Sequence, residues 1–353
     1  MALHDSRREF LYDLLRTASP SGFETAAQRV WTDYVREFAD EVHTDAYGNA
    51  VAVHEGSGDG NVAFGGHADE IGFMVREIGE DGFLSLTRIG GSDRTVSRGQ
   101  HVTVHGEEPV HGVIGQTAIH LRENGEDTVD DISEMAVDVG VDSKEAAEAL
   151  VEVGDPVTFA TELYEMQGSR LTGRGMDNRV GVWAAAEGLR RAAEAGAEAT
   201  VYAVATVQEE VGLNGARMVG FDLDPDAFVA VDVTHATDSP GVPAKRRTGV
   251  EMGGGPVVAR GSTNHPRLVE RAREAAYGAD IDVQLQAAGS RTGTDADAVY
   301  TSRGGIPSLN VGLPNRYMHT PVEVIDTEDL DAVAELLGAV GERAHEYDLG
   351  VEL

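Results

Sequence analysis

The sequence predicts an α/β fold, with a mostly parallel sheet flanked by helices and an inserted small β-rich, barrel-like domain. Apolar runs of strand length, such as residues 200–206 and 227–233, are typical of buried central strands. From residue 171 onwards these runs alternate with helical patterns, which indicates a sheet covered on both faces. Between residues 73 and 167 short alternating strands replace that pattern, and they favour a small barrel or sandwich.

The first 72 residues open the α/β domain with two helices and three strands. Residues 6–9 form a capping box, and apolar residues follow them at helical spacing. The helix should end near residues 19–22, where Ser, Pro and Gly gather, and a second helix should span about residues 24–39. Strands are predicted over residues 41–44, 50–54 and 61–65. The third of these delivers His67 and Asp69 beyond its end.

The inserted domain is predicted to span residues 73–167, so that the α/β domain consists of residues 1–72 and 168–353. Within the insertion we expect strands at 73–78, 83–88, 101–105, 110–118 and 156–159, and one helix at 142–151. After it we expect helices at 178–195, 266–277, 295–301 and 327–347, and strands at 200–206, 227–233, 282–287 and 307–311.

Charge is the dominant feature of the composition. The 353 residues include 61 Asp and Glu against 28 Lys and Arg, a net charge of -33, and only Lys144 and Lys245 are lysines. The acids are dispersed through patterned segments, which argues against a disordered acidic tail. Such a surface indicates adaptation to molar salt, where screening shortens to about 3 Å. Nucleic acid is excluded as an expected partner, because it would be repelled.

The sequence lacks a membrane span, a signal peptide and cysteine, and these absences set the expected location and redox chemistry of the protein. No apolar run approaches the roughly 20 residues of a membrane helix, so no membrane partner is expected. The first residues show no signal-peptide core, and a cytoplasmic protein is expected. Cysteine is absent, which excludes disulfides, thiolate metal ligands and a cysteine nucleophile.

Five places in the chain end an apolar strand or a glycine-rich turn with an imidazole or a carboxylate. They are His67 with Asp69, Asp177, Glu209 with Glu210, Asp232 and His319. Ligands of parallel α/β sheets bind outside the carboxyl ends of the strands, so these groups can converge. Imidazoles and carboxylates without cysteine suit Zn²⁺, Co²⁺ or Mn²⁺. The set exceeds the three protein ligands of one catalytic zinc and fits two metals that share a carboxylate.

Each of these places has an ordinary structural interpretation when it is taken alone. His67 and Asp69 could form a surface turn, and Asp177 could be a helix N-cap. Asp232 could be a turn residue at a strand end, and His319 a buried, hydrogen-bonded histidine. Glu209 and Glu210 could end a solvated strand, but adjacent side chains point in different directions, so one can bind a metal while the other acts on a water. The order and combination of the five favour the metal site.

The sequence resembles the tetrahedral, twelve-subunit metallo-aminopeptidases of archaea and bacteria, and in particular a halophilic archaeal member. The resemblance covers nearly the whole chain. It runs through residues 19–24, 45–49, 66–73, 176–179, 208–212, 231–236, 293–296 and 316–319. It implies a sheet of the zinc-peptidase type and makes the β-rich insertion a dimerisation domain. The sequence departs from the family at Asn214, where relatives often have Arg, and at residues 253–256, which lack a Lys that relatives often carry.

The resemblance also implies roles for the residues of the site. Asp177 would bridge two divalent ions, most often Zn²⁺ or Co²⁺, and the peptide bond after it would be cis. His67 and Asp232 would complete one metal site. Glu210 and His319 would complete the other. Glu209 would be the general base, and Asp69 would orient His67 by accepting its second N–H.

The function implied is removal of N-terminal residues from short peptides with a free N-terminus, by a water that two metals activate. The enzyme would be a self-compartmentalised homo-oligomer, a dodecamer built from dimers. A dinuclear metal deacylase, a carboxypeptidase or a dipeptidase would use a similar ligand set and stays open. A non-catalytic metal-binding scaffold is a further alternative, against which the intact Glu209 argues. Glycoside hydrolysis requires a carboxylate pair and no dinuclear metal, so it is disfavoured.

Overall fold

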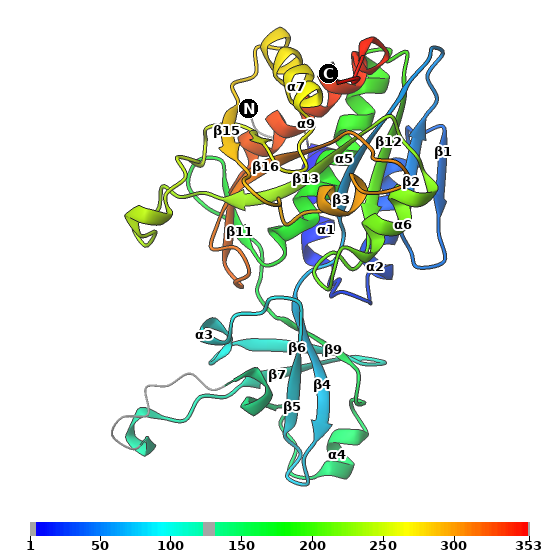
Figure 1. Ribbon diagram of the computed structural model, residues 1–353. Helices are drawn as coiled ribbons and strands as arrows, with labels where there is room; N and C mark the ends of the chain where they lie inside the picture. The colour runs from blue at the N-terminus through cyan, green and yellow to red at the C-terminus, as the bar shows by residue number, and fades with distance from the viewer. Residues whose placement is uncertain (1–4, 123–130, 352–353) are drawn as a thin grey trace.

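An eleven-stranded sheet and a closed six-stranded barrel form the two parts of the chain (Figure 1). The computed structural model describes residues 5–122 and 131–351. The predicted domains also include residues 1–4, 123–130 and 352–353, which lie outside the described residues. No helix in the described part of the chain is long and apolar enough to cross a bilayer.

Four parallel strands lie at the centre of the large sheet. In spatial order they are β12 (Thr200–Thr206), β3 (Asn61–His67), β13 (Ala227–His235) and β16 (Ser308–Arg316). Antiparallel strands extend this centre on both sides, so the whole sheet is mixed. The outer strands are β1 (Glu41–Thr44), β2 (Ala50–His54), β17 (Glu323–Asp326), β11 (Arg170–Gly173), β10 (Tyr164–Glu165), β14 (Val257–Arg260) and β15 (Gln284–Ala287). The predicted parallel α/β centre is therefore confirmed.

Helices cover both faces of the sheet. The larger core packs α1 (Asp5–Arg16), α2 (Thr25–Val35), α5 (Met176–Glu194), α7 (Pro266–Gly278) and α9 (Thr327–Glu342) against one face. The smaller core packs α6 (Asn214–Asp222) and α8 (Ala296–Val299) against the other. Short 3-10 helices are η1 (Ile119–Leu121), η2 (Ile132–Glu134), η3 (Ala244–Arg246) and η4 (Ala344–Glu346).

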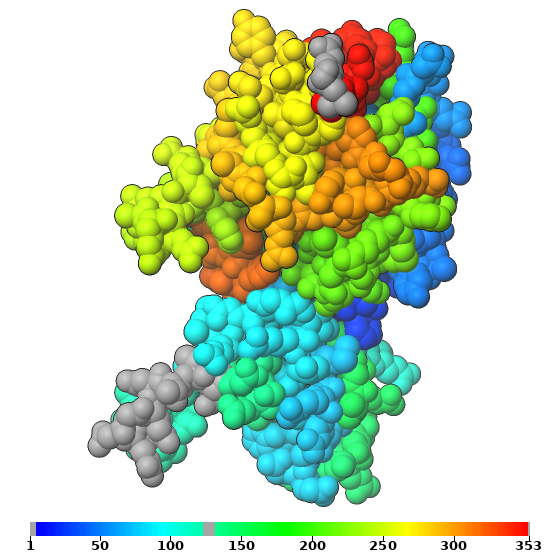
Figure 2. Space-filling model, viewed as in Figure 1, coloured from blue at the N-terminus to red at the C-terminus, as the bar shows by residue number. Residues whose placement is uncertain are grey.

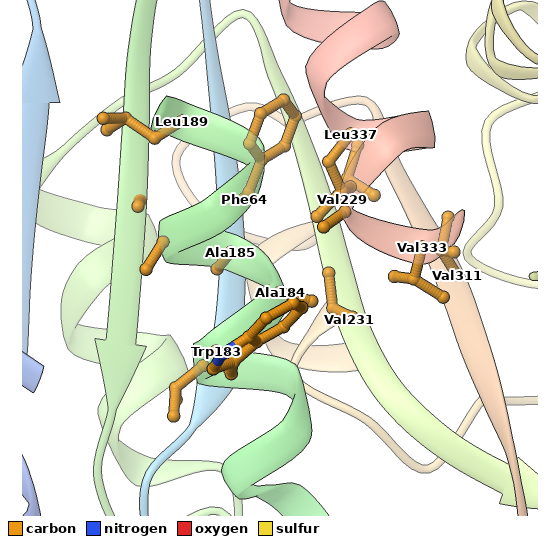
Figure 3. Close-up of a cluster of buried hydrophobic side chains, with 14 of the residues drawn as sticks. Phe64, Trp183, Ala184, Ala185, Leu189, Val229, Val231, Val311, Val333 and Leu337 are labelled. Atoms are coloured by element: carbon orange, nitrogen blue, oxygen red, sulfur yellow. The ribbon is translucent and has the colours of Figure 1, made fainter. Parts of the chain in front are cut away.

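Side chains of the central strands alternate between these two cores, as the two-residue period of a strand requires. Phe64 and Val229 belong to the larger core, and Figure 3 shows them beside Leu337 of α9. Their neighbours Ala63 and Phe228 belong to the smaller core on the opposite face. Burial on both faces explains why these strands are almost continuously apolar.

Five of the six strands of the barrel match strands that the sequence predicts between the two parts of the α/β domain, and β8 (Ala136–Asp138) was not predicted. The strands of the barrel are β4 (Gly72–Ile78), β5 (Leu84–Ile89), β6 (His101–His105), β7 (Pro109–Ile114), β8 and β9 (Pro156–Phe159), closed in the order β4-β5-β8-β7-β6-β9. Two short helices, α3 (Arg94–Ser97) and α4 (Lys144–Glu148), accompany them. The barrel has its own apolar core and projects as a separate lobe (Figure 2). Its predicted bounds, residues 73–167, stay a prediction.

Several predicted element boundaries were wrong. Ser6 lies inside α1 and is not its N-cap. The helix expected at 295–301 is the shorter α8, and the one expected at 142–151 is the shorter α4, whose N-cap is Ser143. Strands β8, β10, β11, β14 and β17 and helices α3 and α6 were not predicted. Strands β13 and β16 are longer than expected because residues 228–235 pair with residues 308–315, so Asp232 lies inside β13 and does not end it.

Candidate active site

The predicted site residues converge at the carboxyl ends of the central strands. His67 ends β3, Glu209 and Glu210 follow β12, and His319 follows β16. Asp232 points from within β13, and Asp177 lies at the start of α5. These six side chains line one cavity of about 340 Å³, and Asp69 is completely buried beside it. The convergence expected from strand topology is thus present in the structure.

Close packing of β3 against α5 brings His67 and Asp177 together. Gly66 precedes His67, and a Cβ atom at this position would lie 2.5 Å from the carbonyl carbon of Gly181 in α5. Only a glycine fits so close an approach of two backbones. The peptide bond between Asp177 and Asn178 is cis, as the resemblance implied.

Asp177 lies between the two histidines, with one carboxylate oxygen facing each. Its Oδ1 is 3.1 Å from Nε2 of His67, and its Oδ2 is 3.1 Å from Nε2 of His319. The remaining acids approach one imidazole each. Asp232 Oδ1 is 3.8 Å from Nε2 of His67, and Glu210 Oε1 is 3.4 Å from Nε2 of His319. The carboxylate of Asp177 therefore has the orientation required of a bridge between two ions.

Two groups of ligand atoms in this arrangement could each hold a metal ion. One consists of His67, Asp177 and Asp232, and the other of Asp177, Glu210 and His319, with ligand atoms within 4.8 Å of one another in each. They share Asp177, as in the predicted pair of sites. A third group of His67, Glu209 and Glu210 satisfies the same distance criterion.

The cavity has an excess of negative charge, which fits bound cations. Burial raises the pKa of Asp232, and the neighbouring Asp177 acts in the same direction. Burial likewise raises the pKa of Glu209. The buried Oε1 of Glu210 accepts no hydrogen bond from the described residues. Buried carboxylates are normally paired or bound to metals, so this donor set fits two divalent ions.

Asp69 connects the first histidine to the two glutamates. Its Oδ1 is 3.3 Å from Nδ1 of His67 and accepts the backbone N–H of Glu209 at 3.0 Å. Its Oδ2 accepts the backbone N–H of Glu210 at 3.1 Å and the hydroxyl of Ser21 at 2.6 Å. The carboxylate of Asp69 therefore lies beside the imidazole that it is predicted to orient, a role that stays a prediction, and it also holds the backbone of the strand end. The second contact was not predicted.

The barrel lobe reaches the second histidine. A Cβ at Gly91, in the loop after β5, would lie 2.8 Å from Nδ1 of His319. His319 itself has a φ of 62°, in the left-handed region that is unusual for a residue with a side chain. Residues in such conformations cluster at functional sites, where the surrounding structure holds them.

Sequence reasoning assigned no role to two buried acids behind the site, Asp295 and Glu323. Asp295 Oδ2 accepts the hydroxyl of Thr206 at 2.5 Å at the end of β12. Burial raises the pKa of Asp295 to about 6 and that of Glu323 to about 8. Asp295 lies in residues 293–296, one of the motifs that carry the resemblance, and Glu323 lies four residues after the candidate ligand His319. These positions in the sequence could have pointed to both acids.

One cation lies at the cavity. Arg291 is exposed and is the only Arg or Lys among the described residues that line it. It forms no ion pair within residues 5–122 and 131–351. The loop that carries it is held by Asp297, which accepts the backbone N–H groups of Thr292 at 3.0 Å and Gly293 at 2.8 Å.

Comparison of the sequence with known proteins finds aminopeptidases, both as a family and as individual relatives. The sequence model of the M42 glutamyl aminopeptidase family matches residues 48–336. A lysyl aminopeptidase of Pyrococcus furiosus is 34% identical over 347 residues, which cover 96% of this chain and 98% of the relative.

Two solved structures share the fold along nearly the whole chain. A TET aminopeptidase from a marine-sediment Thaumarchaeota archaeon superposes with a TM-score of 0.91 at 31% identity, covering 96% of both chains. The TET1 peptidase of Pyrococcus horikoshii superposes with a TM-score of 0.85 at 28% identity, covering 95% of this chain and 99% of its own. The chain therefore belongs to the M42 glutamyl aminopeptidase family, and it is an aminopeptidase.

Proposed function

We propose that the chain is a dinuclear metallo-aminopeptidase with Asp177 as the bridging ligand. His67 and Asp232 would complete one site, and Glu210 and His319 the other. The observation that carries this proposal is the position of Asp177, whose two oxygens each lie 3.1 Å from a different imidazole. The nitrogen and oxygen donors suit Zn²⁺ or Co²⁺.

Glu209 is the proposed general base. When bound, two divalent ions lower the pKa of a water toward 7 and polarise a carbonyl oxygen. Glu209 lines the same cavity, with Oε2 3.9 Å from Nε2 of His67, and its backbone N–H is fixed by Asp69. Its carboxylate takes a proton from the attacking water and returns it to the nitrogen of the departing amine.

The substrates would be short peptides with a free N-terminus, whose α-ammonium group suits the acidic cavity. The names of relatives point to more than one preference, since the family name is glutamyl and the Pyrococcus furiosus relative is lysyl. The charge of Arg291 and its lack of an ion-pair partner among the described residues favour an acidic first side chain.

The enzyme would assemble through the barrel lobe into a cytoplasmic, halophilic dodecamer built from dimers. The Pyrococcus horikoshii relative is described as forming a tetrahedron or a large octahedral shell, and a related structure as a dodecamer. In this chain Ile119 and Leu121, after β7, are 70% and 77% exposed. Apolar side chains so exposed are consistent with a contact between subunits.

The test combines metal analysis with p-nitroanilide substrates in molar salt. The purified protein should bind two ions per subunit and hydrolyse glutamyl p-nitroanilide, and a chelator should abolish hydrolysis. Asp177→Ala should bind less than one ion per subunit, since it removes a ligand from both sites. Hydrolysis of N-acetylated substrates alone would identify a deacylase, and metal binding without any hydrolysis would identify a scaffold.

A further inference from the structure

Glu323 contacts the backbone of two proposed metal ligands at once. It is the first residue of β17 and is 1% exposed. Its Oε2 accepts the backbone N–H of Asp177 at 3.1 Å, and its Oε1 accepts the backbone N–H of His319 at 2.8 Å. One carboxylate therefore joins the start of α5 to the loop after β16.

Strand β17 is placed to make this connection. It pairs with β11, where Glu323 lies opposite Gly173, and β11 leads directly into the segment that carries Asp177. On its other side it pairs with β16, where Val324 lies opposite Arg316, three residues before His319. The ladder on each side fixes the backbone of Glu323 relative to both ligand-bearing segments.

Both of these segments have backbone conformations that regular hydrogen bonding does not hold. Asp177 has φ -76° and ψ 101°, which is not helical although it lies within α5. His319 has a φ of 62°. The first N–H groups of a helix have no partner within the helix, and buried N–H groups need an acceptor. Each oxygen of Glu323 accepts one of these N–H groups, which favours the ionised form against burial, and an ionised carboxylate is a stronger acceptor than a neutral carbonyl.

We propose that Glu323 is a positioning residue that holds Asp177 and His319 at the spacing required for the second metal site. It acts through their backbones, because it neither lines the cavity nor belongs to a group of potential ligands. The inference rests on the proposed role of Asp177 as the bridge. Asp177 belongs to both sites, but only the site of Glu210 and His319 contains both ligands that Glu323 contacts, and His67 is held separately by Asp69. The effect of Glu323 therefore falls mainly on the site of Glu210 and His319.

Glu323→Gln tests this with little change in shape. An amide has a single acceptor oxygen, so one of the two N–H groups must then face an NH₂ group. The matched control is Asp329→Asn. Asp329 is 3% exposed, and its two oxygens accept the backbone N–H groups of Gly253 at 2.7 Å and Gly255 at 2.8 Å. None of these three residues lines the cavity.

The readouts are stepwise Zn²⁺ affinities by competition with a chromophoric chelator, melting temperature, and kcat and KM on a p-nitroanilide. In Glu323→Gln we expect one of the two Zn²⁺ affinities to fall by about 10- to 100-fold, with the other changed much less. Asp329→Asn should lower the melting temperature comparably and leave both affinities unchanged. Glu323→Asp, which keeps the charge but is one methylene shorter, should also weaken the second site and serves if the amide variant fails to fold.

The outcomes separate this inference from the proposed function. If the unaltered protein binds fewer than two ions, the dinuclear proposal and this inference both fail. If it binds two and the Glu323 variants bind both as tightly, the dinuclear proposal stands and the positioning role is overturned. Equal weakening of both affinities in the Glu323 and Asp329 variants would show a merely structural role and would also overturn it.

Discussion

Asp69→Asn should weaken metal binding while leaving every proposed metal ligand in place. The carboxylate meets four partners: the imidazole of His67, the hydroxyl of Ser21, and the backbone N–H groups of Glu209 and Glu210. The hydroxyl can rotate to meet an NH₂ group, but a backbone N–H cannot, and an imidazole that binds a metal through Nε2 keeps its proton on Nδ1. Whichever way the amide turns, one buried N–H loses its acceptor.

The expected loss of Zn²⁺ affinity in Asp69→Asn follows from these contacts. A buried donor left unsatisfied costs about 1–3 kcal/mol. Loss of the carboxylate behind a ligand histidine typically reduces metal affinity by about 10- to 100-fold, equivalent to about 1.4–2.8 kcal/mol. We therefore expect the Zn²⁺ affinity of the His67 site to fall by that factor, and activity to recover in part at saturating Zn²⁺ because Glu209 remains.

The assay is a Zn²⁺ titration of activity on a p-nitroanilide, with Asp45→Asn as the control. Asp45 accepts the backbone N–H groups of Tyr47 at 2.8 Å and Asn49 at 3.0 Å in a turn that does not line the cavity. That variant should titrate like the unaltered protein. An Asp69→Asn protein with unchanged Zn²⁺ affinity and activity would refute the reasoning.

Four further perturbations test separate parts of the molecule. Glu209→Gln should retain two ions but lower kcat by several orders of magnitude, and loss of metal would instead make Glu209 a ligand. Glu70→Ala should lower the free energy of unfolding by about 3–5 kcal/mol in thermal or urea melts, because it leaves the fully buried Arg179 unpaired. Arg291→Glu should reduce kcat/KM for glutamyl relative to leucyl p-nitroanilide by about fivefold or more, and an unchanged ratio would remove Arg291 from specificity. Dialysis to 0.05 M salt should release smaller, inactive species measurable by light scattering, since the net charge is -33 per subunit, and an intact active particle would contradict this.

The contribution of Glu70 to the free energy of unfolding also depends on pH, because its carboxylate is charged only above its pKa. Burial raises the pKa of Glu70, but Arg174 and Arg179 outweigh burial and lower it to about 2. A carboxylate whose pKa is lower in the folded state stabilises the fold above its unfolded pKa. This contribution should therefore be present at neutral pH and be lost as the pH falls from about 4.5 toward 2. In Glu70→Ala the acid-induced loss of stability over that range should be smaller.

The sequence by itself determined the architecture and the donor set. Buried strands such as residues 200–206 are apolar over their full length, and this local signal does not depend on distant residues. Because parallel strands present their carboxyl ends at one edge, His67, Glu210 and Asp232 could be expected to meet. The cis peptide after Asp177 and the bridging role came only from resemblance to known enzymes.

Only the tertiary structure decided how the donors are oriented and held. Strands β11 and β17 are short, and their existence depends on pairing partners far away in the sequence, so local patterns did not reveal them. The same long-range pairing extended β13 beyond the predicted residue 233 to His235. It also placed Glu323 against backbone N–H groups 146 and 4 residues away. A buried acid acquires such a role from the donors that the fold brings to it, and sequence spacing does not specify those donors.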